Sequence, residues 1–254
     1  MIDAAAFTGS WPWRPVGMTA RELASHLGKH GISRALVTPL EGIFWDDPQL
    51  ANERLIESAE GLPLRLVPAV DPTFPSWRRD LETCLNRYGT RALRIFPSYR
   101  GFAVDHPASL ELLELAGREG LTVIVQLRML DARGHNRLAS YPDVSLSAVL
   151  GVAALFPSTR IVLGGARAGE IRAASGALAQ GGNVSVETSA VESMDAIGEL
   201  IGAIGAGRVL FGTHTPLFTT RSALLKLEEA HLLPQESFAV TEGNARYLLE
   251  RAQR

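Results

Sequence analysis

Eight short apolar runs, each followed by a stretch of helical character, constrain this chain more than any other feature. The runs are rich in Val, Ile and Leu and show little apolar/polar alternation, which is typical of strands buried on both faces. They cover residues 2–7, 34–38, 64–70, 92–96, 121–128, 160–163, 183–187 and 208–211. Helices are expected at residues 20–29, 48–59, 77–87, 108–117, 146–156, 168–179, 193–204, 220–230 and 244–251. Strands that alternate with helices predict an α/β fold with a parallel sheet.

Eight is the number of strands that closes such a sheet into a barrel, and 254 residues match the usual barrel length of about 250. The main alternative is an open, doubly wound sheet. No G-x-G-x-x-G follows a strand, and the pair Gly164-Gly165 is too short to indicate a dinucleotide fold. We therefore predict a (β/α)8 TIM barrel that forms one domain over residues 1–254.

The charge and cysteine content narrow the range of partners. The 25 Lys and Arg against 27 Asp and Glu leave a net charge of -2, which gives no electrostatic reason to expect a nucleic acid or a membrane surface. A single cysteine, the absence of a signal-peptide pattern and the absence of a long apolar run lead us to expect a cytoplasmic protein. Whether it forms a homo-oligomer stays open, and the segment Trp11-Pro12-Trp13 is either a lid or a subunit contact.

Polar side chains lie at the predicted carboxyl ends of several strands, where a barrel places its chemistry. Arg94 lies inside an apolar strand, and a buried arginine needs either a core ion pair or a bound anion. Gln126 and Arg128 are two residues apart, so both face the same side of their strand. If that side is the barrel interior, they form part of a pocket floor. Glu187 and His214 follow at the ends of the seventh and eighth strands.

The loop after the fifth strand adds three polar candidates, namely Asp131, Arg133 and His135. Asp131 and Arg133 are either an ordinary loop ion pair or part of the site, and His135 is either solvated or a binding residue. Asp3 at the start of the first strand is either an internal cap or pair, or a functional group. The residues alone leave these alternatives open.

Three motifs carry a resemblance to a known family. Residues 3–9 fit the frame Asp-x-His-x-His-x-Gly at Asp3 and Gly9. Residues 211–216 read Phe-Gly-Thr-His-Thr-Pro, which keeps the frame Phe-Gly-Ser-Asp-x-Pro, and residues 242–249 resemble the signature Gly-Asn-Ala-x-x-Leu of a last helix. In order and spacing the chain resembles the amidohydrolase-related (amidohydrolase 2) family of metal-dependent hydrolases and decarboxylases, in the branch that includes aminocarboxymuconate-semialdehyde decarboxylase. The resemblance spans nearly the whole chain and implies the same barrel.

The positions that bind metal in that family hold other residues here. Ala5 and Phe7 replace its two first-strand histidines, Gln126 and Gly165 replace those of the fifth and sixth strands, and His214 replaces its catalytic aspartate. Alanine, phenylalanine and glycine side chains offer no donor atom, and a glutamine amide is a poor ligand for zinc. We therefore expect no metal at the usual position and no other cofactor.

The leading hypothesis from the resemblance is an enzyme, a hydrolase or a lyase, that acts on a small anionic substrate by acid/base chemistry. Guanidinium groups suit carboxylate and phosphate oxygens, so arginines would bind the anion. The residues expected to bind the substrate are Arg94, Gln126, Arg128, Arg133 and His135.

His214 would be the catalytic acid or base, because an imidazole titrates near neutrality, and Asp131 or Glu187 would orient it. We expect its ring to be partly solvated at the barrel mouth and to matter little for stability. Two alternatives remain. One is a catalytically inactive barrel that binds a ligand or a partner. The other is a metal-dependent hydrolase with a relocated site built from His214, Glu187, His135 and Asp131.

Overall fold

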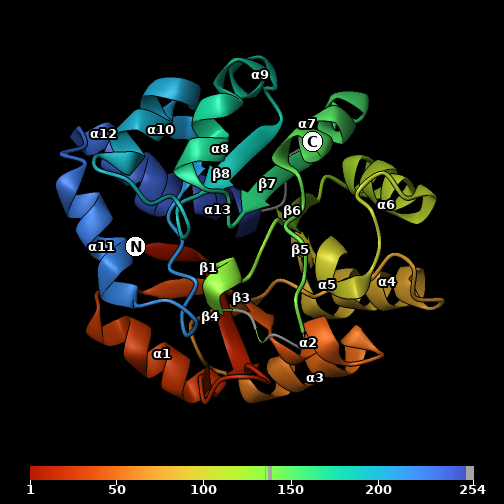
Figure 1. The fold of residues 1–254 in the computed structure, drawn as a ribbon. Coiled ribbons are helices and arrows are strands. Elements are labelled where there is room, and N and C mark those ends of the chain that lie inside the picture. Colours follow the sequence, from red (N-terminus) through yellow and green to blue (C-terminus); the bar gives the residue numbers. More distant parts are fainter. Residues whose placement is uncertain (135, 137–138, 250–254) are drawn as a thin grey trace.

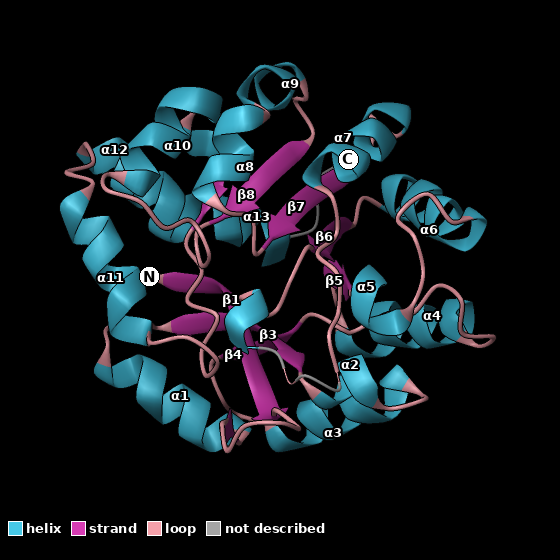
Figure 2. Cartoon of the chain, viewed as in Figure 1, coloured by secondary structure: helices cyan, strands magenta, loops and turns pink. Residues whose placement is uncertain are grey.

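Eight parallel strands form a closed barrel inside a ring of helices (Figures 1 and 2). The computed structural model describes residues 1–134, 136 and 139–249. The predicted α/β barrel is confirmed. Its strands, in chain order and in barrel order, are β1 (Ile2–Ser10), β3 (Arg34–Pro39), β4 (Leu64–Leu66), β5 (Ala92–Ile95), β6 (Thr122–Gln126), β7 (Arg160–Gly164), β8 (Val184–Glu187) and β9 (Val209–Leu210).

Two seams close the barrel. The segment after β4 is joined to β5 by a parallel bridge between Ala69 and Arg94. β1 and the segment after β9 are joined by backbone hydrogen bonds, from the amide of Ala4 to the carbonyl of Phe211 at 2.8 Å and from the amide of His214 to the carbonyl of Ala5 at 2.7 Å. The second seam brings residues from both ends of the chain into one site.

The helices follow the strands as predicted, with several changes at their ends. The predicted helix 168–179 is divided into two short helices, and the one predicted at 193–204 begins only at Ala196. The helices are α1 (Ala20–Lys29), α2 (Glu41–Phe44), α3 (Pro48–Ser58), α4 (Trp77–Tyr88), α5 (Pro97–Arg100), α6 (Pro107–Glu119), α7 (Leu146–Leu155), α8 (Ala168–Ala173), α9 (Ser175–Gln180), α10 (Ala196–Ile204), α11 (Thr220–Glu229), α12 (Pro234–Phe238) and α13 (Asn244–Leu249).

Local signals explain where the first long helices begin. Thr19 caps α1 in a capping box with Glu22, and Asp47 caps α3 by accepting a hydrogen bond from the amide of Gln49. Pro48 occupies the first turn of α3, where its missing N–H costs no hydrogen bond. None of the helices in the described part of the chain is long and apolar enough to cross a membrane.

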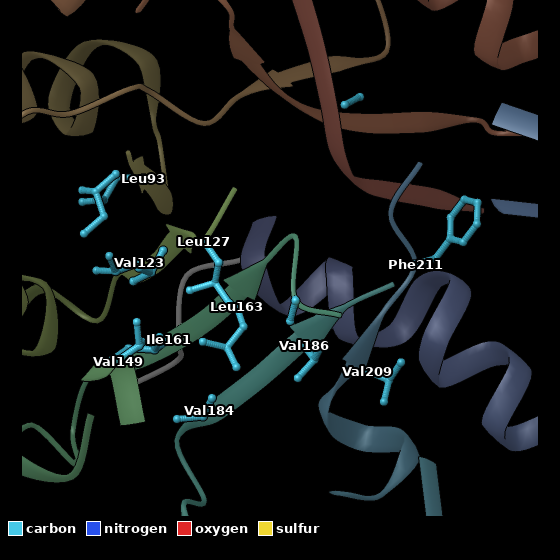
Figure 3. Close-up of a cluster of buried hydrophobic side chains, with 14 of the residues drawn as sticks. Leu93, Val123, Leu127, Val149, Ile161, Leu163, Val184, Val186, Val209 and Phe211 are labelled. Carbon is cyan, nitrogen blue, oxygen red and sulfur yellow. The ribbon is translucent and has the colours of Figure 1, made fainter. Parts of the chain in front are cut away.

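Three apolar layers hold the barrel together. The outer faces of the strands pack against the helices, and Figure 3 shows part of this layer, with Val123, Leu163 and Val186 on neighbouring strands. A second layer fills the barrel near the amino ends of the strands, where α13 supplies Ala245 and Leu248. The third layer, which we call the mouth cluster, closes the carboxyl ends; it contains Phe7, Trp11, Leu40, Ile43, Ala69, Phe96, Met129 and Leu130, with Phe44, Tyr99, Leu217 and Phe218 packed against it.

The segment after β1 takes part in this closure. The indole of Trp11 is buried and lies edge-on to the rings of Phe44 and Tyr99, with centroid distances of 5.1 and 6.0 Å. Trp13 lies beside it and is partly exposed. Within this one chain, the segment covers the barrel mouth, as the lid interpretation predicts.

Candidate active site

Polar residues at the carboxyl ends of the strands form two groups. The first, which we call the interior group, is buried inside the barrel and consists of Asp3, Arg94, Gln126, Glu187 and His214. The second, which we call the rim group, is a set of ion pairs on the loops above the strands and on α8, and it consists of Arg128, Asp131, Asp143, Arg167 and Glu170. The mouth cluster contacts the interior group through Phe7, Met129 and Phe218.

Arg94 places a guanidinium in the interior group. Its side chain has no exposed surface. Nη1 donates to Oε1 of Gln126 at 3.1 Å, and Nη2 donates to the carbonyl oxygen of Ala4 at 3.3 Å. The guanidinium carbon lies 4.6 Å from the centre of the Phe7 ring, which is a cation–π contact. Nε has no hydrogen-bond partner in the part of the chain that the structure describes.

Two carboxylates act on this cation electrostatically. Burial lowers the pKa of Arg94 to about 10, against the opposing influence of Glu187 and Asp3, so the guanidinium stays charged at neutral pH. Burial also raises the pKa of Asp3 to about 6, although hydrogen bonds from Thr213 and from the amide of Ala5 oppose this rise. Asp3 therefore changes its charge near neutrality inside the barrel.

Glu187, Ser189 and His214 form a carboxylate–hydroxyl–imidazole series. Oε1 of Glu187 accepts hydrogen bonds from Oγ of Ser189 at 2.7 Å and from the amide of Gly165 at 2.6 Å. Oγ of Ser189 lies 3.5 Å from Nδ1 of His214, and Nε2 of His214 lies 2.8 Å from the carbonyl oxygen of Met129. Because a carbonyl oxygen only accepts, Nε2 carries the hydrogen and Nδ1 has a lone pair. The serine hydrogen is donated to Glu187, so no hydrogen lies between Nδ1 and the serine oxygen in this state.

The imidazole of His214 is enclosed by apolar side chains. It is 1% exposed, and its ring centre lies 4.8 Å from that of Phe7 and 4.5 Å from that of Phe218. Burial, together with the charge of Arg94, lowers the pKa of His214 to about 3, so the resting imidazole is neutral. The expectation of a partly solvated ring is therefore wrong, because Phe7, Phe218 and the segment at Met129 close over it.

The backbone at His214 is unusual as well. Its φ of 58° lies in the left-handed region, which residues other than glycine rarely adopt. Such conformations persist where the surrounding structure holds them in place, and they are concentrated at functional sites. The amide of His214 is held by the carbonyl of Ala5, while its ring nitrogen is held by Met129.

Arg128 belongs to the rim group and is already paired. β6 ends at Gln126, and the guanidinium of Arg128 binds both carboxylate oxygens of Glu170 at the start of α8. Its Nε lies 3.1 Å from Oδ2 of Asp143, an ion pair without the alignment of a hydrogen bond. Gln126 and Arg128 both lie against Gly165, but their polar groups point in different directions. The amide of Gln126 binds Arg94, whereas the guanidinium of Arg128 binds Glu170.

The remaining loop candidates lie nearer to solvent. Asp131 binds Arg133 at 2.7 Å and Arg167 at 3.4 Å, so the loop ion pair is present. The side chain of Arg133 is 92% exposed, whereas Arg94 is fully buried. The two arginines therefore differ in their access to solvent, and their binding of one substrate anion stays a prediction. His135 lies outside the described residues.

A cavity of about 490 Å³ opens between the rim group and the mouth cluster. Phe218 forms one wall, and its ring also covers His214, so a single aromatic layer separates the cavity from the imidazole. The residues that line the cavity are Arg128, Leu130, Asp131, Arg167, Ala168, Gly169, Glu170, Ala190, Glu192 and Phe218.

Several site residues were not among the sequence candidates. Ser189 lies two residues after the candidate Glu187, and this short spacing was a signal for its contact with the imidazole. The sequence signal for Glu170 was weaker, namely a glutamate at the third position of a helix. In the structure its carboxylate accepts a hydrogen bond from the amide of Arg167. Nothing in the sequence pairs Glu170 with Arg128, 42 residues away.

The residues at the family's metal positions do not fit a metal. Ala5 and Phe7 offer no donor, and the Gln126 amide is bonded to Arg94. At Gly165, where φ is 72°, a Cβ atom would lie 2.7 Å from the carbonyl oxygen of Arg128, so no side chain fits without a shift. Over residues 1–134, 136 and 139–249, no three His, Cys, Asp or Glu side chains are placed to hold a metal ion.

Solved structures share the fold over the full length of the chain. One is 5-carboxyvanillate decarboxylase from Sphingomonas paucimobilis, with 17% identity, a TM-score of 0.77 and 98% of each chain covered. Another is a dihydroxybenzoic acid decarboxylase from Polaromonas sp. JS666 with bound manganese and the inhibitor 2-nitroresorcinol, with 17% identity, a TM-score of 0.78, and 100% of this chain and 97% of the other covered. A third is a 2,6-dihydroxybenzoate decarboxylase in complex with 2,6-dihydroxybenzoate, with 14% identity, a TM-score of 0.77, and 98% of this chain and 99% of the other covered.

The sequence comparisons give one family. No curated protein is similar enough in sequence to match the chain. The family model described as amidohydrolase matches residues 46–251, which is most of the chain. That range includes six of the eight barrel strands, from β4 to β9, and begins after β1 and β3. The chain therefore belongs to the amidohydrolase family.

Proposed function

We propose that this chain is an enzyme that works without a bound metal and acts on a small substrate bearing a carboxylate or a phosphate. The reaction is hydrolysis, or C–C or C–O lysis, by acid/base chemistry. The observation that supports this most is the position of Arg94, whose guanidinium contacts Phe7 and Gln126 at two of the family's ligand positions. A fixed cation at that place can stabilise negative charge that develops on a substrate.

His214 is the proposed acid/base group, with Glu187 as its support through Ser189. A substrate oxygen that replaces the Met129 carbonyl would face Nε2. If Nδ1 then donates to Ser189, Nε2 presents a lone pair and becomes the base. Glu187 already binds that serine and would stabilise the imidazolium that forms, as the carboxylate does in a catalytic triad.

An anionic substrate would also activate this base. The charge of Arg94 contributes to the low pKa of His214. A substrate anion placed beside Arg94 offsets that charge, and the pKa of His214 then rises toward the neutral range. In this proposal the base becomes effective only with substrate bound.

The cavity beside Phe218 is the proposed entrance, with Arg128 and Arg167 on its wall. Both arginines are already paired with carboxylates, so an anion must exchange with Glu170 or Asp131 to bind there. Arg133, on the loop after β6, and His135 are proposed contacts of a larger substrate. The neighbouring structures named above are decarboxylases of hydroxylated aromatic carboxylates, and such compounds are the first substrates to test.

The His214→Gln variant should lower kcat/KM for the substrate by about 10²-fold or more, the usual contribution of a general acid/base group. Glutamine keeps an N–H that can reach the Met129 carbonyl but cannot exchange a proton as imidazole does. The measurement is turnover of a panel of hydroxylated benzoates, followed by absorbance and by CO₂ release. His231→Gln, which changes an exposed histidine, is the matched control and should keep full activity.

The enzyme should keep its activity after dialysis against a chelator, and elemental analysis of the purified protein should show no stoichiometric zinc, manganese or iron. The reason is the donor set, in which only His214 among the family's metal positions offers a suitable ligand. Loss of turnover on chelation, with recovery on addition of one metal, would show that a site outside this donor set carries the chemistry.

A catalytically inactive, ligand-binding barrel is the second candidate. It is favoured by one observation, namely that the mouth cluster covers His214 and leaves the cavity on the other side of Phe218. In that case calorimetry should detect binding of small anions, and the protein should not convert them to products. The affinity for these anions should be unchanged in His214→Gln and weaker in Arg128→Ala.

A further inference from the structure

A continuous series of hydroxyl groups leads from the barrel interior to the outer ring of helices. Oγ1 of Thr213 donates to Oδ2 of Asp3 at 2.5 Å and lies 2.7 Å from Oγ1 of Thr215. Oγ1 of Thr215 lies 2.6 Å from Oγ1 of Thr220, the first residue of α11. Oγ1 of Thr220 lies 2.8 Å from Nε2 of His26, which belongs to α1, next to α11 in the ring (Figure 1).

The two ends of this series differ in their access to water. Asp3 and the three threonines are buried, with at most 3% of their surface exposed, whereas His26 is half-buried on the outer helix. The other hydrogen bonds that Asp3 accepts come from the amides of Ala5 and Thr213, which keep their hydrogens. The hydroxyl series is therefore the hydrogen-bonded connection, among the described residues, that can carry a proton away from this carboxyl.

We propose that one histidine and three threonines conduct protons between solvent and the Asp3 carboxyl, in the order His26, Thr220, Thr215 and Thr213. This relay is independent of which reaction the barrel carries out. Its effect is that a carboxyl deep inside the barrel exchanges its proton with solvent without any opening of the mouth cluster.

The transfer conserves every hydroxyl group. When Asp3 ionises, its proton passes to Oγ1 of Thr213, whose own hydrogen passes to Thr215. The hydrogen of Thr215 passes to Thr220, and that of Thr220 passes to Nε2 of His26. The imidazolium that forms releases its Nδ1 proton to water. Each threonine keeps one hydrogen but reverses the direction of its hydrogen bond, and either direction is open between Thr215 and Thr220.

The charges around both ends suit this transfer. Asp3 faces Arg94 and Glu187 from β5 and β8, and its pKa of about 6 lets it hold or release a proton near neutrality. Burial and the neighbouring His30 and Lys29 lower the pKa of His26, so its ring is neutral at neutral pH and can accept a proton.

A purely structural role makes a different prediction. Three buried threonines could simply satisfy one another's hydrogen bonds. The replacement of Thr215 by valine, which has the same shape, would then change stability but not the rate at which Asp3 gains a proton. The rate of Asp3 protonation, measured on the folded protein, therefore distinguishes a proton relay from a purely structural role.

The test is time-resolved infrared spectroscopy after laser release of protons from a caged acid, with the full-length protein. The carbonyl stretch of protonated Asp3 is identified by its loss in Asp3→Asn. Thr215→Val should slow the appearance of this band by about tenfold or more, as expected when one link of a buried network is removed. Thr215→Ser should restore the rate, and Thr38→Val, which removes a buried hydroxyl elsewhere in the barrel, should leave it unchanged.

His26→Leu tests the solvent end of the relay. Because His26 is half-buried, this variant should fold even if Thr215→Val does not. It should slow the band by a similar factor. An unchanged rate in a folded Thr215→Val or His26→Leu protein would overturn the relay. The relay would also be overturned if the rate of Asp3 protonation rose steeply at urea concentrations well below the unfolding transition. Such a dependence indicates that the proton enters through transient opening of the barrel.

Discussion

Arg94→Met is expected to lower the free energy of unfolding by about 3–5 kcal/mol, the usual cost of leaving buried charges without their partner. Arg94 is fully buried and is the cation that Glu187 and Asp3 face inside the barrel. Methionine fills much of the volume but removes the charge that faces both carboxyls, and of the two only Glu187 keeps a second cation, Lys226, nearby. Urea unfolding at neutral pH, followed by tryptophan fluorescence and circular dichroism, measures the change.

The pH dependence of this loss separates charge from packing. Asp3 can take up a proton near pH 6, which removes its own uncompensated charge. The cost of Arg94→Met should therefore be smaller at pH 5 than at pH 8. Arg133→Met is the matched control, because its side chain is 92% exposed, and it should shift stability by less than about 0.5 kcal/mol. A cost below 1 kcal/mol for Arg94→Met, or one that does not change with pH, would mean that the guanidinium acts only as packing.

His214 should make the protein sensitive to acid. Its pKa is about 3 in the folded state and near 6.5 in the unfolded chain, so the folded state binds fewer protons between these values. The stability that this burial contributes is fully present above pH 6.5 and is lost as the pH falls toward 3. Between pH 7 and pH 5 the loss amounts to about 2 kcal/mol.

A comparison of wild type with His214→Gln isolates this contribution. The contribution of Asp3 has the opposite sign, because its raised pKa favours the folded state as the pH falls from about 6 to about 4. It is present in both proteins and cancels in the difference. Urea unfolding at pH 7 and pH 5 should show wild type losing about 2 kcal/mol more than the variant, and His231→Gln should behave as wild type. Equal losses in wild type and His214→Gln would place the imidazole in contact with water.

The barrel could be predicted from the sequence because each strand carries its own signal. The apolar runs at 34–38 and 160–163 read as doubly buried strands without knowledge of their partners. The start of α3 at Asp47-Pro48 is equally local. The helix prediction was less accurate at residues 168–179, where the structure has α8 and α9 instead of one helix.

The candidate site was harder to predict from the sequence, because its contacts join segments that are distant along the chain. The parity of Gln126 and Arg128 predicts a shared side, and both do flank Gly165, but no local rule predicts that Glu170 binds the guanidinium. The burial of His214 depends on Phe218 and on the carbonyl of Met129, 85 residues away. Polar residue type and strand position can be taken from a sequence, whereas the partner of each polar group depends on the folded loops.

The close approach at Gly165 limits which metal-ligating side chains could be built into this barrel. A histidine there would place its Cβ 2.7 Å from the carbonyl of Arg128, so the loop after β6 would have to be rebuilt first. Histidines at Ala5 and Phe7 would then meet a permanent positive charge from Arg94, which contacts the Phe7 ring from within. A metal cation bound there would be repelled by that guanidinium. A protein engineer would therefore remove the arginine before adding any ligand, and each step taken alone would weaken the fold.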